Sequence, residues 1–186
     1  MIRVGCTSSL VIVGILTAGT AHAQEPGKIG ITMGYPSAVG VIWQASDAIA
    51  IRPVITFAGT LSDSTATTSG ASNWNVGTTI SALFYVKKYD NVRTYVSPSY
   101  RYSHTSTTIT PSSAVPNVGT IGTTANSNGA TGSFGAEYAP VKRVRIYGEV
   151  GFSYAHSTTS GSTPSVLNST GNSWGTTAGV GFVFYP

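Results

Sequence analysis

The chain has 186 residues and a formal net charge of +4, yet charged residues make up only 9% of it, where about 25% is usual for a soluble domain. Its basic residues are scattered, which excludes the basic stripe that nucleic-acid-binding proteins carry. Low charge accompanies disorder when aromatic residues are scarce. Because the chain holds ten tyrosines, six phenylalanines and three tryptophans, we expect a folded domain.

The N-terminal segment has the organisation of a secretory signal peptide. Arg3 precedes a short apolar run, and the sequence AHA at 21–23 is a small-x-small cleavage site. The run is too short to span a bilayer as a helix. We therefore predict a signal peptide at 1–23 and a mature domain at 24–186. Cys6 is the one cysteine of the chain, so the mature domain is expected to contain no disulfide.

Eight segments of the mature chain alternate between apolar and polar residues with a period of two, which indicates β-strands. They are 28–35, 39–46, 49–60, 74–87, 92–106, 130–139, 144–156 and 173–185. Short connections alternate with long loops rich in Ser, Thr and Gly at 61–73, 107–128 and 157–172. In a meander every second connection lies at the same end. The pattern therefore predicts an all-β fold, an eight-stranded antiparallel up-and-down transmembrane β-barrel.

The two faces of the predicted strands differ in their chemistry. One face is apolar, and its large aromatic residues gather near both strand ends; they include Trp43, Trp74, Phe84, Tyr102, Tyr138, Tyr154, Trp174, Phe182 and Phe184. The other face is small and polar, and it carries Arg52, Arg93, Arg101, Glu137, Arg145 and Glu149. Aromatic belts around an aliphatic band match the two interfaces of a bilayer, whereas Arg facing lipid costs about 2–4 kcal/mol at the midplane. We predict that the belts face lipid and the six charges face the lumen.

Two prolines interrupt the predicted strands. Pro53 and Pro98 each lack the N–H that a ladder hydrogen bond needs. We therefore expect a β-bulge at each proline.

This architecture resembles the small eight-stranded outer-membrane barrels, the group that contains outer-membrane proteins A and X and the opacity-type surface proteins. The resemblance covers 24–186 and rests on the signal peptide, the strand pattern and the last strand. It implies export through the periplasm to the bacterial outer membrane. It also implies insertion by the barrel-assembly machinery, which recognises a final strand with alternating aromatic residues, here Val180, Phe182 and Phe184. The additional Tyr185-Pro186 departs from that pattern.

The inward charges have two interpretations. A barrel of eight strands is just wide enough for side chains to fill, and buried charges are retained when they are paired, so a structural plug is the first. Glu137 and Arg145 flank a short turn and are expected to face each other, while contact of Glu149 with Arg93 or Arg101 depends on the barrel shear. Because inward cations outnumber inward acids, a narrow, gated, weakly anion-favouring pore is the alternative.

A hydrolase is a third and weaker hypothesis. The segment RYSHTS at 101–106 resembles the His-x-Ser element of lipid A deacylases, which are eight-stranded barrels with a lipid-facing Ser-His-acid site. The resemblance implies that His104 activates the Ser106 hydroxyl. Because Glu137 and Glu149 are predicted to point inward, Asp63 in the neighbouring long loop is the one candidate for the acid. The segment lacks the Asn-Ala-Gly that follows in that family, and His156 occupies a similar position. An interfacial histidine is the simpler interpretation, so we predict no enzyme activity.

The sequence offers no cofactor site. Two histidines and no cysteine in the mature chain do not make a metal cluster, and the glycines at 129 and 132 lack the lysine and helix of a phosphate loop. The nearly uncharged long loops argue against a tight binding epitope. We therefore predict a structural or surface-interaction protein, with outer-membrane lipid, the barrel-assembly machinery and an unidentified surface ligand as its partners.

Overall fold

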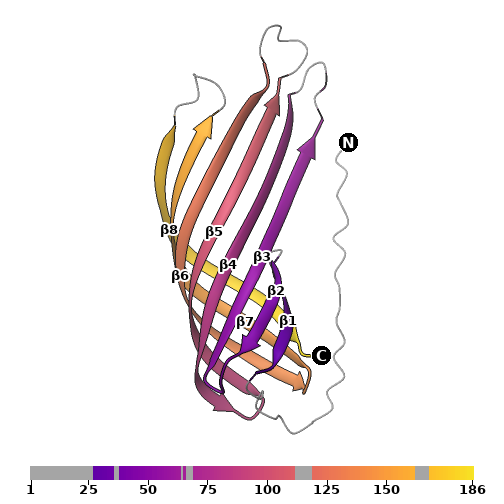
Figure 1. The fold of residues 1–186 in the computed structure, drawn as a ribbon, viewed down its shortest axis with the longest axis vertical. Helices are drawn as coiled ribbons and strands as arrows, with labels where there is room; N and C mark the ends of the chain where they lie inside the picture. Colours follow the sequence, from indigo (N-terminus) through magenta and orange to yellow (C-terminus); the bar gives the residue numbers. More distant parts are fainter. Residues whose placement is uncertain (1–26, 36–37, 64, 66–68, 112–118, 162–167) are drawn as a thin grey trace, which may run out of the picture.

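Eight antiparallel strands form one closed sheet (Figure 1). The computed structural model describes residues 27–35, 38–63, 65, 69–111, 119–161 and 168–186, so the predicted signal peptide lies outside it. The strands are β1 (Ile29–Tyr35), β2 (Ala38–Gln44), β3 (Ile49–Ser62), β4 (Gly70–Tyr89), β5 (Val92–Thr110), β6 (Ile121–Val141), β7 (Val144–Gly161) and β8 (Ser169–Phe184). Each strand pairs with the next and β8 pairs with β1. The predicted eight-stranded up-and-down barrel is confirmed.

The three short turns lie at one end of the barrel, together with the C-terminus (Figure 1). We call this the short-turn end, and the opposite end the long-loop end. The turn between β4 and β5 has two residues, Asp90 and Asn91, and Asp90 has a φ of 33°. Asp tolerates this left-handed conformation, which suits a tight hairpin turn. Among the described residues, no helix is long and apolar enough to cross a membrane.

Most strands extend further toward the long-loop end than the sequence indicated. β6 begins at Ile121 rather than at 130, and β8 begins at Ser169 rather than at 173. Much of the Ser/Thr-rich sequence expected to form loops is therefore strand. Thr is β-branched and favours strands. Side-chain hydrogen bonds also join the extended parts, because the Asn73 and Asn75 amides of β4 donate to threonine hydroxyls of β5 at 2.7 and 2.6 Å.

The expectation of a bulge at each proline is wrong. The pairing of β3 with β4 continues in register through Pro53, and that of β5 with β6 through Pro98. A proline removes a hydrogen bond but adds no residue, so the register is kept. The irregularities lie near the short-turn end instead, at Tyr85/Lys87 and at Tyr138/Val141.

The wall of the barrel is uneven in height. β1 and β2 have seven residues each, whereas the other strands have 14 to 21. β3 pairs with β2 only as far as Thr56, and β8 pairs with β1 only from Val180 onward. Beyond the tip of the β1–β2 hairpin, the facing edges of β3 and β8 have no strand between them in the described part of the chain. We call this interval the lateral opening (Figure 1).

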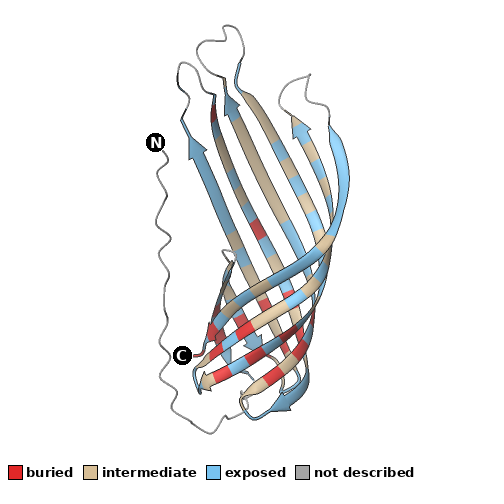
Figure 2. Cartoon of the chain, turned by 180° about the vertical axis from the view of Figure 1, so that it is seen from behind, coloured by how far each residue is buried: buried red, intermediate tan, exposed pale blue. Residues whose placement is uncertain are grey.

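The buried core lies inside the barrel, in the half near the short-turn end (Figure 2). Its apolar members are Ile42, Ala50, Leu83, Tyr95, Tyr147, Val183 and Tyr185. Glycines in the wall make room for two of the tyrosine rings. A Cβ on Gly135 would overlap the Tyr95 ring, and one on Gly181 would lie 2.5 Å from the Tyr147 ring. Tyrosine rings and apolar side chains therefore pack inside the barrel at this level.

Candidate functional site

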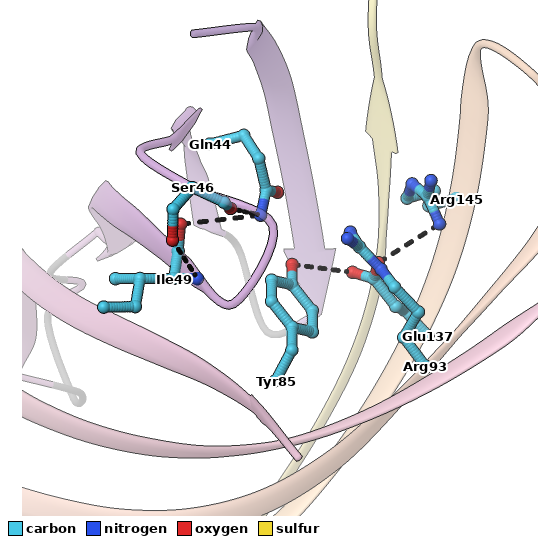
Figure 3. Close-up of polar contacts among 7 residues, drawn as sticks. All are labelled: Gln44, Ser46, Ile49, Tyr85, Arg93, Glu137 and Arg145. Atoms are coloured by element: carbon cyan, nitrogen blue, oxygen red, sulfur yellow. Dashed lines mark hydrogen bonds and ion pairs between the residues drawn. The ribbon is translucent and has the colours of Figure 1, made fainter. Parts of the chain in front are cut away.

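A carboxylate with two arginines occupies the lumen near the short-turn end (Figure 3). Arg93 Nε donates to Glu137 Oε1 at 2.6 Å, and Arg145 Nη1 lies 3.2 Å from the same oxygen. The Tyr85 hydroxyl donates to Glu137 Oε2 at 3.3 Å. Glu137 is 2% exposed. We call these four residues the lower charge cluster; Glu137 and Arg145 come from strands flanking one short turn, as the sequence suggested.

Positive charge is in excess in the lower charge cluster. Two guanidinium groups surround one carboxylate, and the Arg93 guanidinium also lies 3.9 Å from the centre of the Tyr85 ring, a cation–π distance. Arg145 Nε and the Tyr185 hydroxyl are buried without a hydrogen-bond partner. Burying charge is tolerated only with close pairing, so the cluster depends on Glu137.

A second ion pair lies across the lumen. Arg52 Nη2 of β3 lies 2.5 Å from Glu149 Oε1 of β7, and the Tyr95 hydroxyl donates to the same oxygen at 2.8 Å. The Arg52 guanidinium also lies 4.7 Å from the centre of the Tyr147 ring. We call these four residues the upper charge cluster. Glu149 therefore pairs with Arg52 and not with Arg93 or Arg101, because the shear brings strands that are far apart in the sheet to one level.

Arg101 belongs to neither cluster. It lines a cavity of about 230 Å³ that lies on the long-loop side of the upper charge cluster. Seven Ser and Thr residues also line it: Thr56, Thr79, Ser81, Ser99, Thr131, Ser133 and Thr177. We call this space the upper cavity. The structure thus divides the six inward charges among two paired clusters and one arginine that lines the upper cavity.

The nine aromatic residues predicted for the belts are exposed on the outer face of the barrel. They lie at two levels. Trp174 and Phe184, for example, are ten residues apart on β8. At about 3.3 Å per residue on a strand tilted by about 40°, this places them about 25 Å apart along the barrel axis. Aliphatic side chains such as Ile80 and Val150 are exposed between the two levels.

His104 lies on the outer face beside a carboxamide. Its Nδ1 is 2.7 Å from Asn126 Oδ1, and the Tyr102 hydroxyl donates to the same oxygen at 3.0 Å. The His104 ring also lies against the Trp74 ring, with 5.2 Å between centroids. Among the contacts of the described residues, none joins His104 to Ser106 or to Asp63. The structure therefore does not bring the proposed nucleophile, base and acid together.

The same arrangement occurs a second time on the outer face. His156 Nδ1 lies 2.8 Å from Asn172 Oδ1, and the Tyr154 hydroxyl donates to that oxygen at 3.0 Å. Sequence reasoning noted both histidines but missed the asparagines, which lie on neighbouring strands. A repeated Tyr–Asn–His arrangement is more typical of a polar girdle than of one catalytic centre. Within the described chain, no group of three or more His, Cys, Asp or Glu residues is placed to hold a metal ion.

Comparison with solved structures identifies the architecture. The chain is similar to a major outer membrane protein from Thermus thermophilus, with a TM-score of 0.61 and 14% identity over 85% of this chain and 98% of that chain. The fold is that of an outer-membrane β-barrel. The match to CarO2 from Acinetobacter baumannii has a TM-score of 0.45 and 12% identity over 87% of this chain and 98% of that chain. The match to CarO from the same organism has a TM-score of 0.44 and 14% identity over 88% of this chain and 99% of that chain. The sequence matches no protein family model and no curated protein sequence.

Proposed function

We propose that the protein is an integral barrel of the bacterial outer membrane with a structural or surface-interaction role. The exposed aromatic belts and the aliphatic band between them support a transmembrane position, because a band of about 25 Å matches that of known membrane barrels. Export depends on the signal peptide at 1–23. The short-turn end faces the periplasm, and the long-loop end, with its Ser/Thr-rich strand extensions, faces the outside of the cell.

The lumen of the proposed membrane protein is closed rather than conducting. The observation that carries this is the buried Glu137, held by Arg93 and Arg145 below the second pair, Arg52–Glu149. Buried ion pairs and tyrosine rings on wall glycines leave the lower lumen filled. Plugging is the expected state of a barrel of this size, since eight strands enclose room for side chains but not for a wide channel.

Conductance measurements test the closed lumen. Purified barrel inserted into planar phosphatidylcholine bilayers is expected to show no steady current in concentrated KCl, although the same sample shows the folded band on an unheated gel. A steady, anion-favouring current in the wild type would contradict the closed lumen and support the pore alternative. The Glu137→Gln variant is measured beside the wild type. It removes the charge that holds Arg93 and Arg145, so its current shows how conductance responds when the lower charge cluster is disrupted.

Cysteine labelling tests the orientation, because Cys6 lies in the predicted signal peptide and the mature domain has no other cysteine. Ser160→Cys places a thiol near the long-loop end of β7, and Lys142→Cys places one in the turn between β6 and β7. On intact cells, a membrane-impermeant maleimide is expected to label the first variant only. Permeabilising the outer membrane exposes the second. Labelling of both on intact cells, or of neither, would contradict the proposed orientation.

The C-terminal strand is proposed to carry the signal for the barrel-assembly machinery. Val180, Phe182 and Phe184 are exposed on the outer face of β8. Tyr185 is buried, and its backbone N–H donates to the Arg143 carbonyl at 2.8 Å. The departure from the common ending is therefore a core residue and not a free tail. Phe182→Ala with Phe184→Ala is expected to lower the amount of assembled barrel in cells, whereas deletion of Pro186 leaves it unchanged.

A further inference from the structure

Three hollows share lining residues at the end of β1 and the beginning of β2. The upper cavity inside the barrel shares Gly34 and Ala38 with an apolar groove on the outer face, which Met33, Val39, Ile55 and Phe57 complete. It shares Tyr35 and the β8 segment 178–180 with a second outer groove, which includes Phe134 and Val150. The cavity and the two grooves therefore lie on either side of one stretch of wall, which is next to the lateral opening.

The inside and the outside of this opening differ in chemistry. The upper cavity presents hydroxyl groups, two arginines and the Glu149 carboxylate, together with small apolar residues. Arg52 is engaged by Glu149, whereas none of the ion pairs found in the described part of the chain includes Arg101. The lining therefore carries a net positive charge. The grooves outside present aliphatic and aromatic side chains. A pocket that carries charged and hydroxyl groups and lies next to apolar grooves suits an amphipathic ligand.

The level of the opening decides which compartment it meets. Tyr35, at the hairpin tip, pairs with Val180 on β8, and Val180 lies between Trp174 of one belt and Phe184 of the other. If the barrel spans the outer membrane as proposed above, the opening lies within the hydrocarbon band. Unpaired strand edges are tolerated there only where they line a water-filled cavity or are covered. The upper cavity lines the unpaired edge of β8 at 177–179, and on β3 it reaches as far as Thr56, the last residue that pairs with β2.

We propose that the upper cavity binds the head group of a single-chain fatty carboxylate, whose alkyl chain leaves through the lateral opening into the outer grooves. Arg101 pairs with the carboxylate, since guanidinium–carboxylate hydrogen bonds are charge-assisted, and the surrounding hydroxyls donate to it. The cavity volume of about 230 Å³ is below the roughly 300–1,000 Å³ of sites that enclose a whole drug-sized ligand. It therefore takes the head group and the first carbons, and the rest of the chain stays outside.

Binding of radiolabelled dodecanoate to the mature barrel in phosphatidylcholine nanodiscs tests the proposal at pH 8, where the carboxylate is ionised. Arg101→Gln is expected to weaken binding about ten- to a hundredfold, the usual effect of losing a hydrogen bond to a charged group. Arg143→Gln is the matched control, because Arg143 is exposed in the turn between β6 and β7. Dodecanol competes poorly if the carboxylate is recognised. Equal binding by both variants, or equal competition by dodecanol, would overturn the proposal.

A second pair of variants tests the route. Gly179 lines both the cavity and an outer groove, and the nearest neighbour that a Cβ there meets is the Tyr35 carbonyl oxygen at 3.7 Å. Gly179→Phe is therefore expected to fold and to obstruct the opening, which lowers dodecanoate affinity at least tenfold. Gly132→Phe adds the same ring where a Cβ meets nothing within 4 Å, and it is expected to bind like the wild type. Unchanged binding by Gly179→Phe would exclude the lateral route.

This inference rests on the proposed membrane location, and the two fail in distinguishable ways. Nanodiscs that contain folded, protease-resistant barrel but bind no dodecanoate overturn the ligand site and leave the membrane function standing. A chain that does not enter nanodiscs or cell outer membranes overturns the proposed function itself. Gel mobility without heating reports the folded barrel for every variant, so loss of binding is separated from loss of folding.

Discussion

Glu137 is the residue on which the lower charge cluster depends, and its replacement gives the sharpest prediction. Glu137→Gln keeps the shape of the side chain and one acceptor oxygen but removes the negative charge. Arg93 and Arg145 would then face each other without a carboxylate between them, and both are 4% exposed at their side chains. Removal of one partner from a buried ion pair costs about 3–5 kcal/mol. We expect a loss of that size in the free energy of unfolding.

The second ion pair provides the comparison. The Glu149 side chain is 17% exposed and faces one arginine, Arg52. Arg52 and Glu149 both line the upper cavity, so water can reach the Arg52 guanidinium when the Glu149 carboxylate is replaced. Glu149→Gln should therefore cost less, about 1–3 kcal/mol, the usual penalty of leaving a polar group unsatisfied. The order of the two losses follows from burial and from the number of arginines each carboxylate holds.

Urea unfolding in phosphatidylcholine vesicles measures both losses, with the fluorescence of the outward tryptophans as the signal. A triple variant, Arg93→Met with Glu137→Leu and Arg145→Met, is the control. It replaces the charges by apolar groups and is expected to be as stable as the wild type or more so. A change below about 1 kcal/mol for Glu137→Gln, well under the usual cost of breaking a buried pair, would show that water reaches the cluster, and the closed lumen would then be wrong.

Further predictions concern the wall and the C-terminus. Val150→Arg, in the middle of the outer band, should destabilise the inserted barrel by about 2–4 kcal/mol, whereas Thr158→Arg, beyond the belt, should change little; vesicle unfolding compares them. Gly135→Ala pushes a Cβ into a tyrosine ring and should cost about 1–3 kcal/mol, against less than about 0.5 kcal/mol for Gly132→Ala. Burial raises the pKa of Tyr185 to about 12, so its neutral phenol stabilises the fold below about pH 10, the ordinary pKa of tyrosine, and that contribution is lost as the pH rises toward 12. The free energy of unfolding, measured at both pH values, should therefore fall more between them for the wild type than for Tyr185→Phe.

The alternation of side chains allowed the fold to be predicted. Each strand shows one apolar face in the sequence, and the structure places the belt residues of that face outside and Arg52, Glu137 and Glu149 inside. The inner face is less polar than predicted, because apolar residues such as Ile42, Leu83 and Val183 form the buried core there. The inward and outward alternation of side chains continues along β3 and β5 because the two prolines leave the register intact. The boundaries at the long-loop end were wrong, since Ser- and Thr-rich sequence is compatible with loops and with strands, and cross-strand hydrogen bonds such as Asn73–Thr107 decide between them.

The contacts across the lumen depend on the stagger of the closed sheet, which the sequence of no single strand determines. Glu137 and Arg145 are close in sequence and flank one turn, so their contact was foreseeable. Arg52 and Glu149 are 97 residues apart, and they meet only because the strands tilt and the sheet closes with a particular stagger. The stagger follows from the sum of all the registers. A residue's level in the barrel, and therefore its partner, is determined only when every hairpin is placed.

The lateral opening likewise depends on how the strands combine, because it results from a difference in length between neighbouring strands. β1 and β2 are short, and the sequence indicated both as segments of eight residues, but their length matters only once the tall edges of β3 and β8 are known to flank them. Gly34 and Ala38, at the ends of these two strands, line both the upper cavity and an outer groove.

Lengthening the hairpin tests this view of the opening. Inserting about four residues of alternating Thr and Val after Tyr35, and as many before Ala38, should extend both strands, pair with both edges, close the opening and abolish dodecanoate binding. The barrel should become more stable, because each new residue satisfies backbone groups that hydrocarbon cannot. Retained binding in a folded, lengthened variant would show that the ligand enters from the long-loop end instead.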